Sequence, residues 1–349
     1  MGRKTIGDFM KKVTMQDIAD KLGVSKSLVS ISLNNRYGVS DEMRYKIYLT
    51  AVEMGYDFKY NYKSKNRVKR NNIVAFLRKE ELLQSNYWGE LLMGVEKTLN
   101  YNNLNLRIET WNDETTKEEI LIKIAENSTD GLIILNDIPN GVINKLKKLN
   151  IPVVFVDGKK YTDKDFDSVR TNSYLGGYIT AQYFYDLGHR KMAFIGDKNF
   201  SISFRERYYG FKNFIDEHED IEYYGSIYQT TFDTEETYVG KSNIVKEIDP
   251  SNYPTAIFCA NDTIATFTYA ELTKLKLRIP EDVSIIGFDN LDTSSTMHPP
   301  LTSVNVLKDE LGQTATELLL NRIKFPDTPI RSILLSVELD LKRSVRRIK

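Results

Sequence analysis

The chain has 349 residues, more than one ordinary hydrophobic core accommodates, so its length predicts two or three domains. Its single cysteine, Cys259, excludes an internal disulfide framework, and with 3 histidines no spacing indicates a metal site. The 48 Lys and Arg residues balance 48 Asp and Glu residues, but the zero net charge conceals an asymmetry along the chain.

The N-terminal part of the chain is basic and the remainder is acidic. Residues 1–70 carry 15 Lys and Arg against 7 Asp and Glu, which leaves 33 against 41 for the rest. The basic part therefore has an electrostatic reason to bind a polyanion. Because no apolar run approaches ~18 residues and no signal peptide is visible, we expect a protein of the reducing cytoplasm, associated with the nucleoid and without a membrane span.

The first predicted elements are two short helices joined at a glycine, after an N-terminal extension of residues 1–12. Thr14 stands as an N-cap with Asp17 three positions later, which is the spacing of a capping box. Apolar residues then recur at helical spacing, and Gly23 supplies the left-handed residue of a tight turn. Ser25 caps the second helix.

The second helix has an apolar inner face and a small, polar outer face. Val29 and Leu33 fall on the inner face. A third helix begins after Ser40 and ends at Gly55. Residues 59–71 are basic and polar with no apolar face, which is typical of a linker or hinge.

Beyond the linker, short apolar runs alternate with helical patterns. The runs IVAFL, GLIIL, PVVFV, KMAFI, AIFC and VSIIGF are nearly continuous in apolar residues, as strands buried on both faces are. This alternation predicts an α/β fold of two doubly wound parallel sheets. Because ligands bind beyond the carboxyl ends of the strands in such folds, the residues that end strands are the candidates for a binding site.

The two N-terminal helices form a helix-turn-helix pattern, the strongest functional signal in the chain. In this motif the second helix enters the DNA major groove with its N-terminal residues at base edges. The alternative is a helical hairpin that only packs. The basic surroundings and the small polar outer face favour DNA binding.

The segment VTMQDIADKLGVSKSLVSISLNN, followed by GVSDEMRYKIYLTAVEMGY, resembles the DNA-binding headpiece of the lactose and galactose repressor (LacI-type) family of bacterial transcription regulators. The resemblance continues through DGLIIL, LGHRKMAFIGD, RERYYGF, CANDTIA, VSIIGFDN and PPLTSVNVLKDELGQTATELL, so it covers the chain from Val13 onward. It implies a small all-α headpiece, a hinge, and an α/β sensor of two periplasmic-binding-protein-like lobes. The implied boundaries are 13–58 for the headpiece, 59–71 for the hinge, 72–169 with 301–330 for the first lobe, and 170–300 with 331–349 for the second.

The resemblance also assigns DNA contacts by position. Base-reading positions are Lys26, Ser27 and Ile31, and phosphate-contacting positions are Thr14, Ser25, Ser30, Asn34 and Ser40. Ile31 departs from the arginine common at its place, and an aliphatic side chain contacts a thymine methyl but cannot form a bidentate pair with guanine. Lys65 stands where many members carry a leucine that wedges into the minor groove, so a flexible basic tether that does not kink DNA is the alternative for the hinge.

In the sensor, the resemblance implies an effector site at strand ends. Arg207 matches the family's effector-binding arginine, and its planar guanidinium suits adjacent sugar hydroxyls or a carboxylate. The other candidates are Asp289, Asn261, Phe232 and Asp157, with Tyr87 and Trp88 supported only by their place near a strand end. A surface or interdomain ion pair is the alternative for the charged residues, and ordinary packing is the alternative for the aromatic ones. Asp262 alternatively caps the following helix.

The sequence gives no support for catalysis. His189 and His218 have no nucleophile or paired acid at a recognisable spacing, and we interpret both as solvated loop residues. No phosphate-binding loop or strand-anchored dinucleotide motif is present, so we expect neither an enzyme nor a cofactor.

Together these patterns predict a homodimeric, sequence-specific transcription regulator, a repressor, whose affinity for a palindromic operator is switched by a small sugar-like effector. One alternative keeps DNA binding but makes a phosphocarrier protein the main trigger. Another is a cytoplasmic solute-binding module with a vestigial headpiece. The C-terminal run contains no leucine heptads that would indicate a coiled-coil tetramer.

Overall fold

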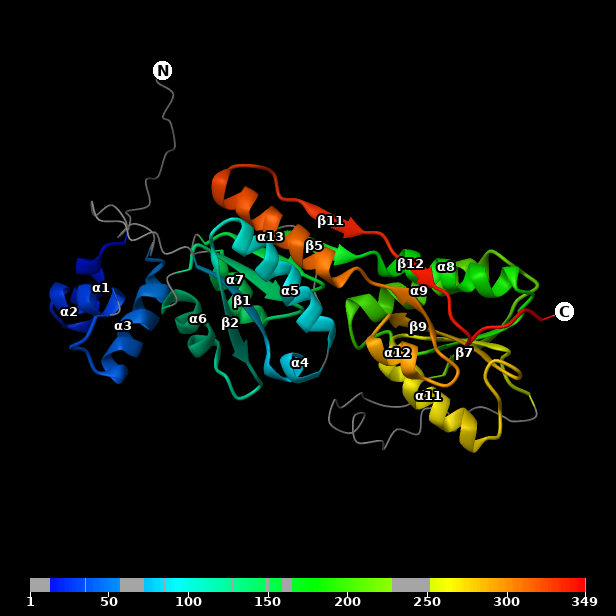
Figure 1. The fold of residues 1–349 in the computed structure, drawn as a ribbon. Helices are drawn as coiled ribbons and strands as arrows, with labels where there is room; N and C mark the ends of the chain where they lie inside the picture. The colour runs from blue at the N-terminus through cyan, green and yellow to red at the C-terminus, as the bar shows by residue number, and fades with distance from the viewer. Residues whose placement is uncertain are drawn as a thin grey trace, which may run out of the picture. The chain divides into compact units, whose positions relative to one another are not determined.

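The computed structural model describes residues 13–34, 36–56, 72–84, 86–126, 129–147, 151–158, 165–227 and 252–348 (Figure 1). The chain divides into two compact units. The first is drawn from Met1–Leu83, Glu96–Val154 and Thr316–Pro329, and the second from Gln84–Val95, Phe155–Ala315 and Ile330–Lys349. None of the helices in the described ranges is long and apolar enough to cross a membrane.

Three short helices begin the first unit, as the sequence predicted. They are α1 (Met15–Leu22), α2 (Lys26–Leu33) and α3 (Asp41–Met54). Gly23 (φ 64°) and Gly55 (φ 73°) end α1 and α3 in the left-handed conformation that favours glycine. The helices enclose a core of Ile18, Ala19, Val29, Leu33, Ile47, Tyr48, Ala51 and Tyr56. The predicted all-α headpiece is confirmed.

The first sheet has six strands in the order β11-β5-β4-β3-β1-β2. Their bounds are β1 (Asn72–Arg78), β2 (Asn105–Trp111), β3 (Gly131–Leu135), β4 (Val153–Val156), β5 (Asp167–Thr171) and β11 (Ser332–Leu335). Strand β1 pairs in parallel with β2 and β3, and β11 pairs in parallel with β5. The inner strands β3 and β4 are buried along their whole length, which explains their continuous apolar sequence. The helices that alternate with these strands are α4 (Lys79–Gln84), α5 (Asn86–Tyr101), α6 (Lys117–Glu126) and α7 (Asn140–Leu146).

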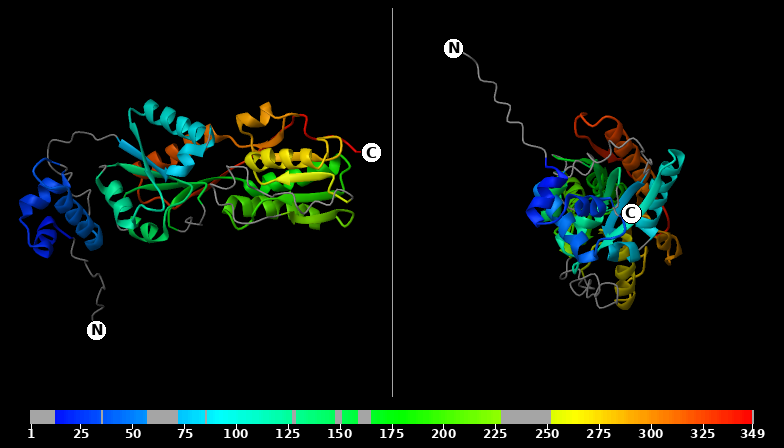
Figure 2. Two further views of the ribbon diagram at one scale, coloured as in Figure 1. Left: turned by 90° about the horizontal axis from the view of Figure 1, so that it is seen from below. Right: turned by 90° about the vertical axis from the view of Figure 1, so that its left-hand side faces the viewer.

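The second sheet also has six strands, in the order β12-β10-β9-β8-β6-β7. They are β6 (Lys191–Ile195), β7 (Glu222–Ile227), β8 (Ala256–Cys259), β9 (Ser284–Asp289), β10 (Thr302–Asn305) and β12 (Glu338–Asp340). The helices of this part are α8 (Ser173–Asp186), α9 (Ile202–Asp216), α11 (Asp262–Lys274) and α12 (Asp292–Thr296), whereas α13 (Lys308–Lys324) packs against α5 and β3. Figures 1 and 2 show α8 and α9 on one face of this sheet and α11 on the other. The doubly wound α/β arrangement predicted from the alternating pattern is confirmed.

One edge strand departs from the expected parallel sheets. Strand β12 runs antiparallel to β10, whereas β6, β8, β9 and β10 pair in parallel. Only residues 336 and 337 separate β11 from β12. A parallel pair of strands needs a long crossover connection, usually with a helix. The chain instead passes directly from β11 in the first sheet to β12 in the second, and β12 pairs in the antiparallel direction. The predicted lobe boundaries stay a prediction; β11, within 331–349, pairs in the first sheet.

Helices α8 and α9 lie in direct backbone contact, which fixes the helix that carries Arg207. A Cβ atom added to Gly177 of α8 would lie 2.0 Å from the carbonyl oxygen of Arg207. A Cβ atom added to Gly210 of α9 would lie 1.9 Å from the carbonyl oxygen of Tyr174. Glycine at both positions therefore allows the two helices to pack closely enough for their backbones to touch.

Candidate functional site

Helix α2 carries the residues predicted to read bases. Val29 and Leu33 turn into the headpiece core. Lys26 and Ser27 are exposed and Ile31 is half-buried. Because Ser27 and Ile31 are four residues apart, they share one face of the helix. The geometry is compatible with groove reading, and base contact by these three residues stays a prediction.

Three of the residues predicted to contact phosphate are helix N-caps. The hydroxyls of Thr14, Ser25 and Ser40 accept hydrogen bonds from backbone amides at 3.3, 3.1 and 3.4 Å, respectively. Asp17 completes the expected capping box with Thr14. A helix N-terminus offers free amides and a positive partial charge to an anion. The caps thus mark three places suited to phosphate, and the contacts themselves stay predictions.

The remaining phosphate candidates lie at the end of α2. The side-chain Nδ2 of Asn34 donates to the carbonyl oxygen of Ser30 at 2.7 Å and to its Oγ at 3.4 Å, so these two side chains lie next to each other. Sequence analysis overlooked the loop that follows. There Tyr37 is fully exposed, and Arg44 donates to the carbonyl oxygen of Arg36 at 2.8 Å. An aromatic residue in a polar loop beside α2 is a sequence signal that would have marked this loop as a further candidate.

Two predicted residues cannot be placed. Lys65 of the hinge and Phe232 of the effector site lie outside the residues that the structure describes. Their predicted roles stay predictions.

In the second unit, Arg207 on α9 is buried and held at several points. Its Nη1 donates to the carbonyl oxygen of Ala260 at 2.6 Å, and its Nη2 donates to Oδ1 of Asp289 at 3.0 Å. The guanidinium lies over the ring of Phe288, 3.6 Å from its centroid. With 5% of its surface exposed, Arg207 does not belong to a surface ion pair. The buried Nε atom has no hydrogen-bond partner, so one donor is left for a ligand.

Asp289 is the last residue of β9 and lies in a strained turn. Asp289 and Asn290 have φ angles of 97° and 49°, which non-glycine residues seldom adopt and which cost about 1–3 kcal/mol each. Burial raises the pKa of Asp289, and the charges of Arg207 and Lys308 oppose that rise. The nearby cations Arg207 and Lys308 therefore offset part of the cost of burying the Asp289 carboxylate.

Asp157, Tyr87 and Trp88 form a second group in the same unit. Oδ2 of Asp157 accepts a hydrogen bond from the Tyr87 hydroxyl at 2.6 Å, and its Oδ1 accepts one from the amide of Thr171 at 2.8 Å. Burial and the charge of Asp157 raise the pKa of Tyr87 well above its ordinary value. The charges of Asp289 and Arg207 also act on this pKa, so Tyr87 lies close to that pair. Trp88 meets Tyr87 edge-on, with ring centroids 5.0 Å apart.

Asn261, and not Asp262, caps the helix that follows β8, and effector binding by Asn261 stays a prediction. Asn261 is the N-cap of α11, because its Oδ1 accepts a hydrogen bond from the amide of Ile264 at 2.9 Å. Asp262 does not cap the helix. It is fully buried and accepts hydrogen bonds from Ser303 Oγ at 2.6 Å and from the Leu291 amide at 2.8 Å. Burial, together with the charge of Asp289, raises the pKa of Asp262 to about 7.

Sequence reasoning missed Lys308, the first residue of α13. Its side chain is 4% exposed. A lysine followed by Asp309 and Glu310 has the local pattern of a solvated helix start, so no sequence signal distinguished it. Only the tertiary structure buries it close enough to act on Asp289.

The expectation that His189 is solvated is wrong. His189 is buried, and its Nε2–H donates to the carbonyl oxygen of Arg346 at 3.0 Å, which leaves Nδ1 to accept from the Thr255 hydroxyl. Burial lowers the pKa of His189 to about 4. His218 is half-buried and stacks on Phe214. Within the described ranges, no cluster of three or more His, Cys, Asp or Glu side chains could hold a metal ion.

Comparison with known proteins covers both parts of the chain. Residues 14–57 match the family described as bacterial regulatory proteins, lacI family, and residues 181–345 match a periplasmic binding protein-like domain. The ribose operon repressor of Haemophilus influenzae is 31% identical over 338 residues, 96% of this chain and 99% of its own. The transcriptional repressor PurR of Mannheimia succiniciproducens is 28% identical, with the same coverage of 96% and 99%. A crystal structure of a LacI family transcriptional regulator from Enterococcus faecium with bound ribose is 27% identical, has a TM-score of 0.65, and covers 80% of this chain and 100% of that one.

Proposed function

Because the chain belongs to the lacI family of bacterial regulatory proteins, we propose that it is a repressor that binds a palindromic operator as a homodimer and is controlled by a small sugar. A protein that binds chromosomal operators works in the cytoplasm. A second headpiece is needed because one recognition helix reads too few base pairs to be selective, and two-fold symmetry matches a palindrome. We assign base reading to Lys26, Ser27 and Ile31, and phosphate contact to the caps of the three headpiece helices.

The buried Arg207–Asp289 pair is the observation that carries the sugar assignment. A sugar hydroxyl accepts from a guanidinium and donates to a carboxylate, so adjacent hydroxyls fit donors and acceptors that lie together. Arg207 retains a buried Nε without a partner, and Asp157 and Tyr87 lie near the same pair. Two carboxyl groups beside one arginine favour a neutral polyol over an anion.

Ribose is the first sugar to test. The relative with 31% identity is named as a ribose operon repressor, and the structure with 27% identity contains ribose. Control follows by linkage: if ribose binds one conformation better, it changes operator affinity, and the operator changes ribose affinity by the same factor. The sign of that coupling decides whether ribose releases or strengthens repression, and we propose release.

Selection of bound duplexes from a random pool by the full chain, at one stated salt concentration, tests DNA binding first. We expect a palindrome with two half-sites. The selected duplex is then titrated with protein in the absence and presence of ribose, with xylose as the matched pentose, and a ribose-specific loss of affinity of about tenfold or more is expected. Failure to enrich any sequence contradicts the repressor. Enrichment without a ribose response contradicts the effector but leaves standing a repressor that is triggered by a protein such as a phosphocarrier. A ribose response that survives Arg207→Ala removes Arg207 from the effector site.

A further inference from the structure

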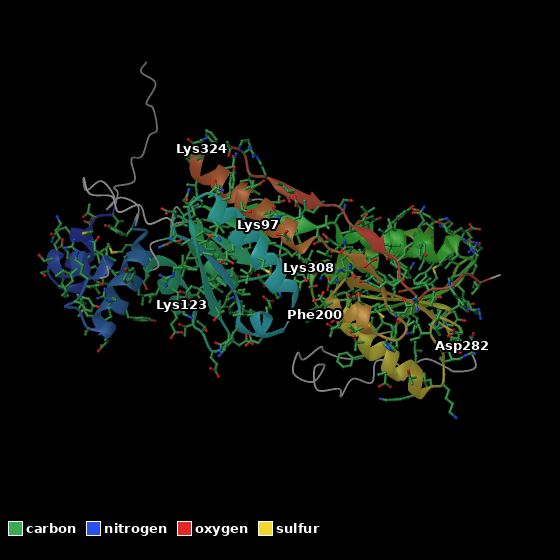
Figure 3. All side chains as sticks on the ribbon, in the orientation of Figure 1. Lys97, Lys123, Phe200, Asp282, Lys308 and Lys324 are labelled. Carbon is green, nitrogen blue, oxygen red and sulfur yellow. The ribbon has the colours of Figure 1, made fainter. Side chains whose placement is uncertain are left out.

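Lys308 is a buried cation in a place that does not favour one. Figure 3 shows it at the start of α13, with Lys324 at the other end of the same helix. Lysine is seldom buried unless it is paired, and a helix N-terminus repels a positive charge. The 4% exposure of the Lys308 side chain therefore requires compensating interactions.

Two partners from different elements supply this compensation. Lys308 Nζ lies 3.2 Å from Oε2 of Glu90 on α5 and donates to the carbonyl oxygen of Asn290 at 3.4 Å. The Glu90 side chain is 40% exposed, so it keeps much of its hydration while Lys308 does not. The ammonium group thus joins α5 to the turn that follows β9.

The Asn290 turn is held through every polar group of that residue. Its amide donates to Ser303 Oγ and its Nδ2 to Asn305 Oδ1, both at 3.1 Å. Its Oδ1 accepts from Lys342 Nζ at 2.7 Å, and its carbonyl oxygen accepts from Lys308. These bonds offset the unfavourable φ angle of Asn290 and therefore fix the direction of the preceding carboxylate.

Lys308 also acts on both halves of the candidate effector site. Its charge opposes the burial that raises the pKa of Asp289, second only to Arg207 among the favourable charges. Its partner Glu90 follows Tyr87 by three residues, so the two lie on one face of α5 about one helical turn apart. A single ammonium group is therefore linked to the Asp289 turn and to the helix that presents Tyr87.

We propose that Lys308 is a positioning residue of the effector site, which holds the Asp289 turn against α5 through Glu90 and the carbonyl oxygen of Asn290. This inference rests on the function proposed above and sharpens it. Loss of Lys308 then impairs the site without removing any ligand contact.

The first test needs no ligand. Full-length wild type, Lys308→Met, Asp289→Asn and the double variant are unfolded with urea at one protein concentration. At about pH 8, we expect Lys308→Met to lower the folding equilibrium constant by about tenfold more in the wild-type background than in Asp289→Asn. The difference shrinks as the pH falls and Asp289 takes up a proton. Lys324→Met, an exposed lysine of the same helix, serves as the control with no coupling to Asp289.

Ribose calorimetry supplies the second test. We expect about tenfold weaker binding in Lys308→Met, about threefold weaker in Lys308→Arg, and no change in Lys324→Met. If Lys308→Met does not fold, Glu90→Gln, which leaves Lys308 in place, is used instead of Lys308→Met in both measurements. Weaker ribose binding in Glu90→Gln supports the proposal. Equal ribose affinity in Lys308→Met and wild type overturns it, and so does an unfolding cycle without coupling. If wild type binds no ribose, the effector assignment fails while the unfolding cycle still decides the role of Lys308.

Discussion

Helix α2, which we propose reads DNA, and the proposed effector site display their polar side chains in opposite ways. On α2, Lys26 and Ser27 are exposed and make no contribution to the headpiece core. In the second unit, Arg207 and Asp289 are buried and bonded to each other. An exposed group can change without changing the fold, whereas a buried charge supports both the fold and the ligand. Substitutions in the headpiece should therefore separate binding from stability, and substitutions in the sensor should not.

The largest effect is expected for Arg207→Ala. Removing the guanidinium leaves Asp289 buried without its main partner, which costs about 3–5 kcal/mol of unfolding free energy. We also expect complete loss of the ribose effect on operator binding. Urea unfolding and operator titration measure the two effects. Arg205→Ala changes an exposed arginine on the same helix and should alter stability by less than about 0.5 kcal/mol. A normal ribose response in Arg207→Ala would remove Arg207 from the site.

The second largest effect is expected for Gly177→Ala, which tests whether displacing Arg207, without removing it, weakens ribose binding. In Gly177→Ala, the added Cβ atom would lie 2.0 Å from the carbonyl oxygen of Arg207, so α8 and α9 must separate. We expect a loss of about 3 kcal/mol in stability and weaker ribose binding, with operator binding retained. Gly89→Ala is the matched control, because a Cβ atom there meets nothing within 4 Å. An unchanged ribose affinity in Gly177→Ala would show that Arg207 tolerates displacement.

The headpiece and the effector site could not be predicted equally well from the sequence. The headpiece could be read from local signals, because the caps Thr14, Ser25 and Ser40 and the turn glycine Gly23 are each decided within a few residues. The strands could be predicted equally well from the sequence, since burial on both faces selects continuous apolar runs. Chain-order reasoning could identify the end of β9, but it could not show which helix residue meets it.

The sensor site depends on contacts between residues far apart in the chain. Arg207 and Asp289 were singled out only through a family resemblance, and their hydrogen bond spans 82 positions. Asn290, Lys308 and the contact at Gly177 were missed, because a lysine or a glycine in a helix has the same local pattern whether it is solvated or buried. His189 was assigned to solvent for the same reason.

Two buried titratable groups of the second unit sharpen the comparison through pH. The folded-state pKa of His189, about 4, lies below its ordinary 6.5, so the unfolded chain binds the proton first and stability is lost as pH falls through this range. The folded-state pKa of Asp262, about 7, lies above its ordinary 3.8, so the folded chain keeps its proton longer and stability is lost as pH rises. The two contributions oppose each other between about pH 4 and pH 6.5.

Substituting either His189 or Asp262 should reveal the pH dependence of stability that the other residue contributes. On acidification from about pH 7 to pH 5, we expect His189→Gln to lose about 2 kcal/mol less stability than wild type, and Asp262→Asn to lose about 2 kcal/mol more. Urea unfolding across that range measures both differences. Parallel pH profiles in wild type and Asp262→Asn would show that Asp262 is ionised throughout the range.

The smallest effect on the fold, and the cleanest separation of function from stability, is expected for Lys26→Ala. Lys26 is the first residue of α2, where a positive charge opposes the helix dipole, so its removal should leave stability unchanged or raise it by about 0.3 kcal/mol. Loss of a base contact should reduce discrimination between the selected operator and a non-specific duplex by about 1–2 kcal/mol. Lys46→Ala, on the exposed surface of α3, should leave that ratio unchanged. Equal weakening of specific and non-specific binding in Lys26→Ala would instead make Lys26 a phosphate contact, because such a contact carries no sequence information.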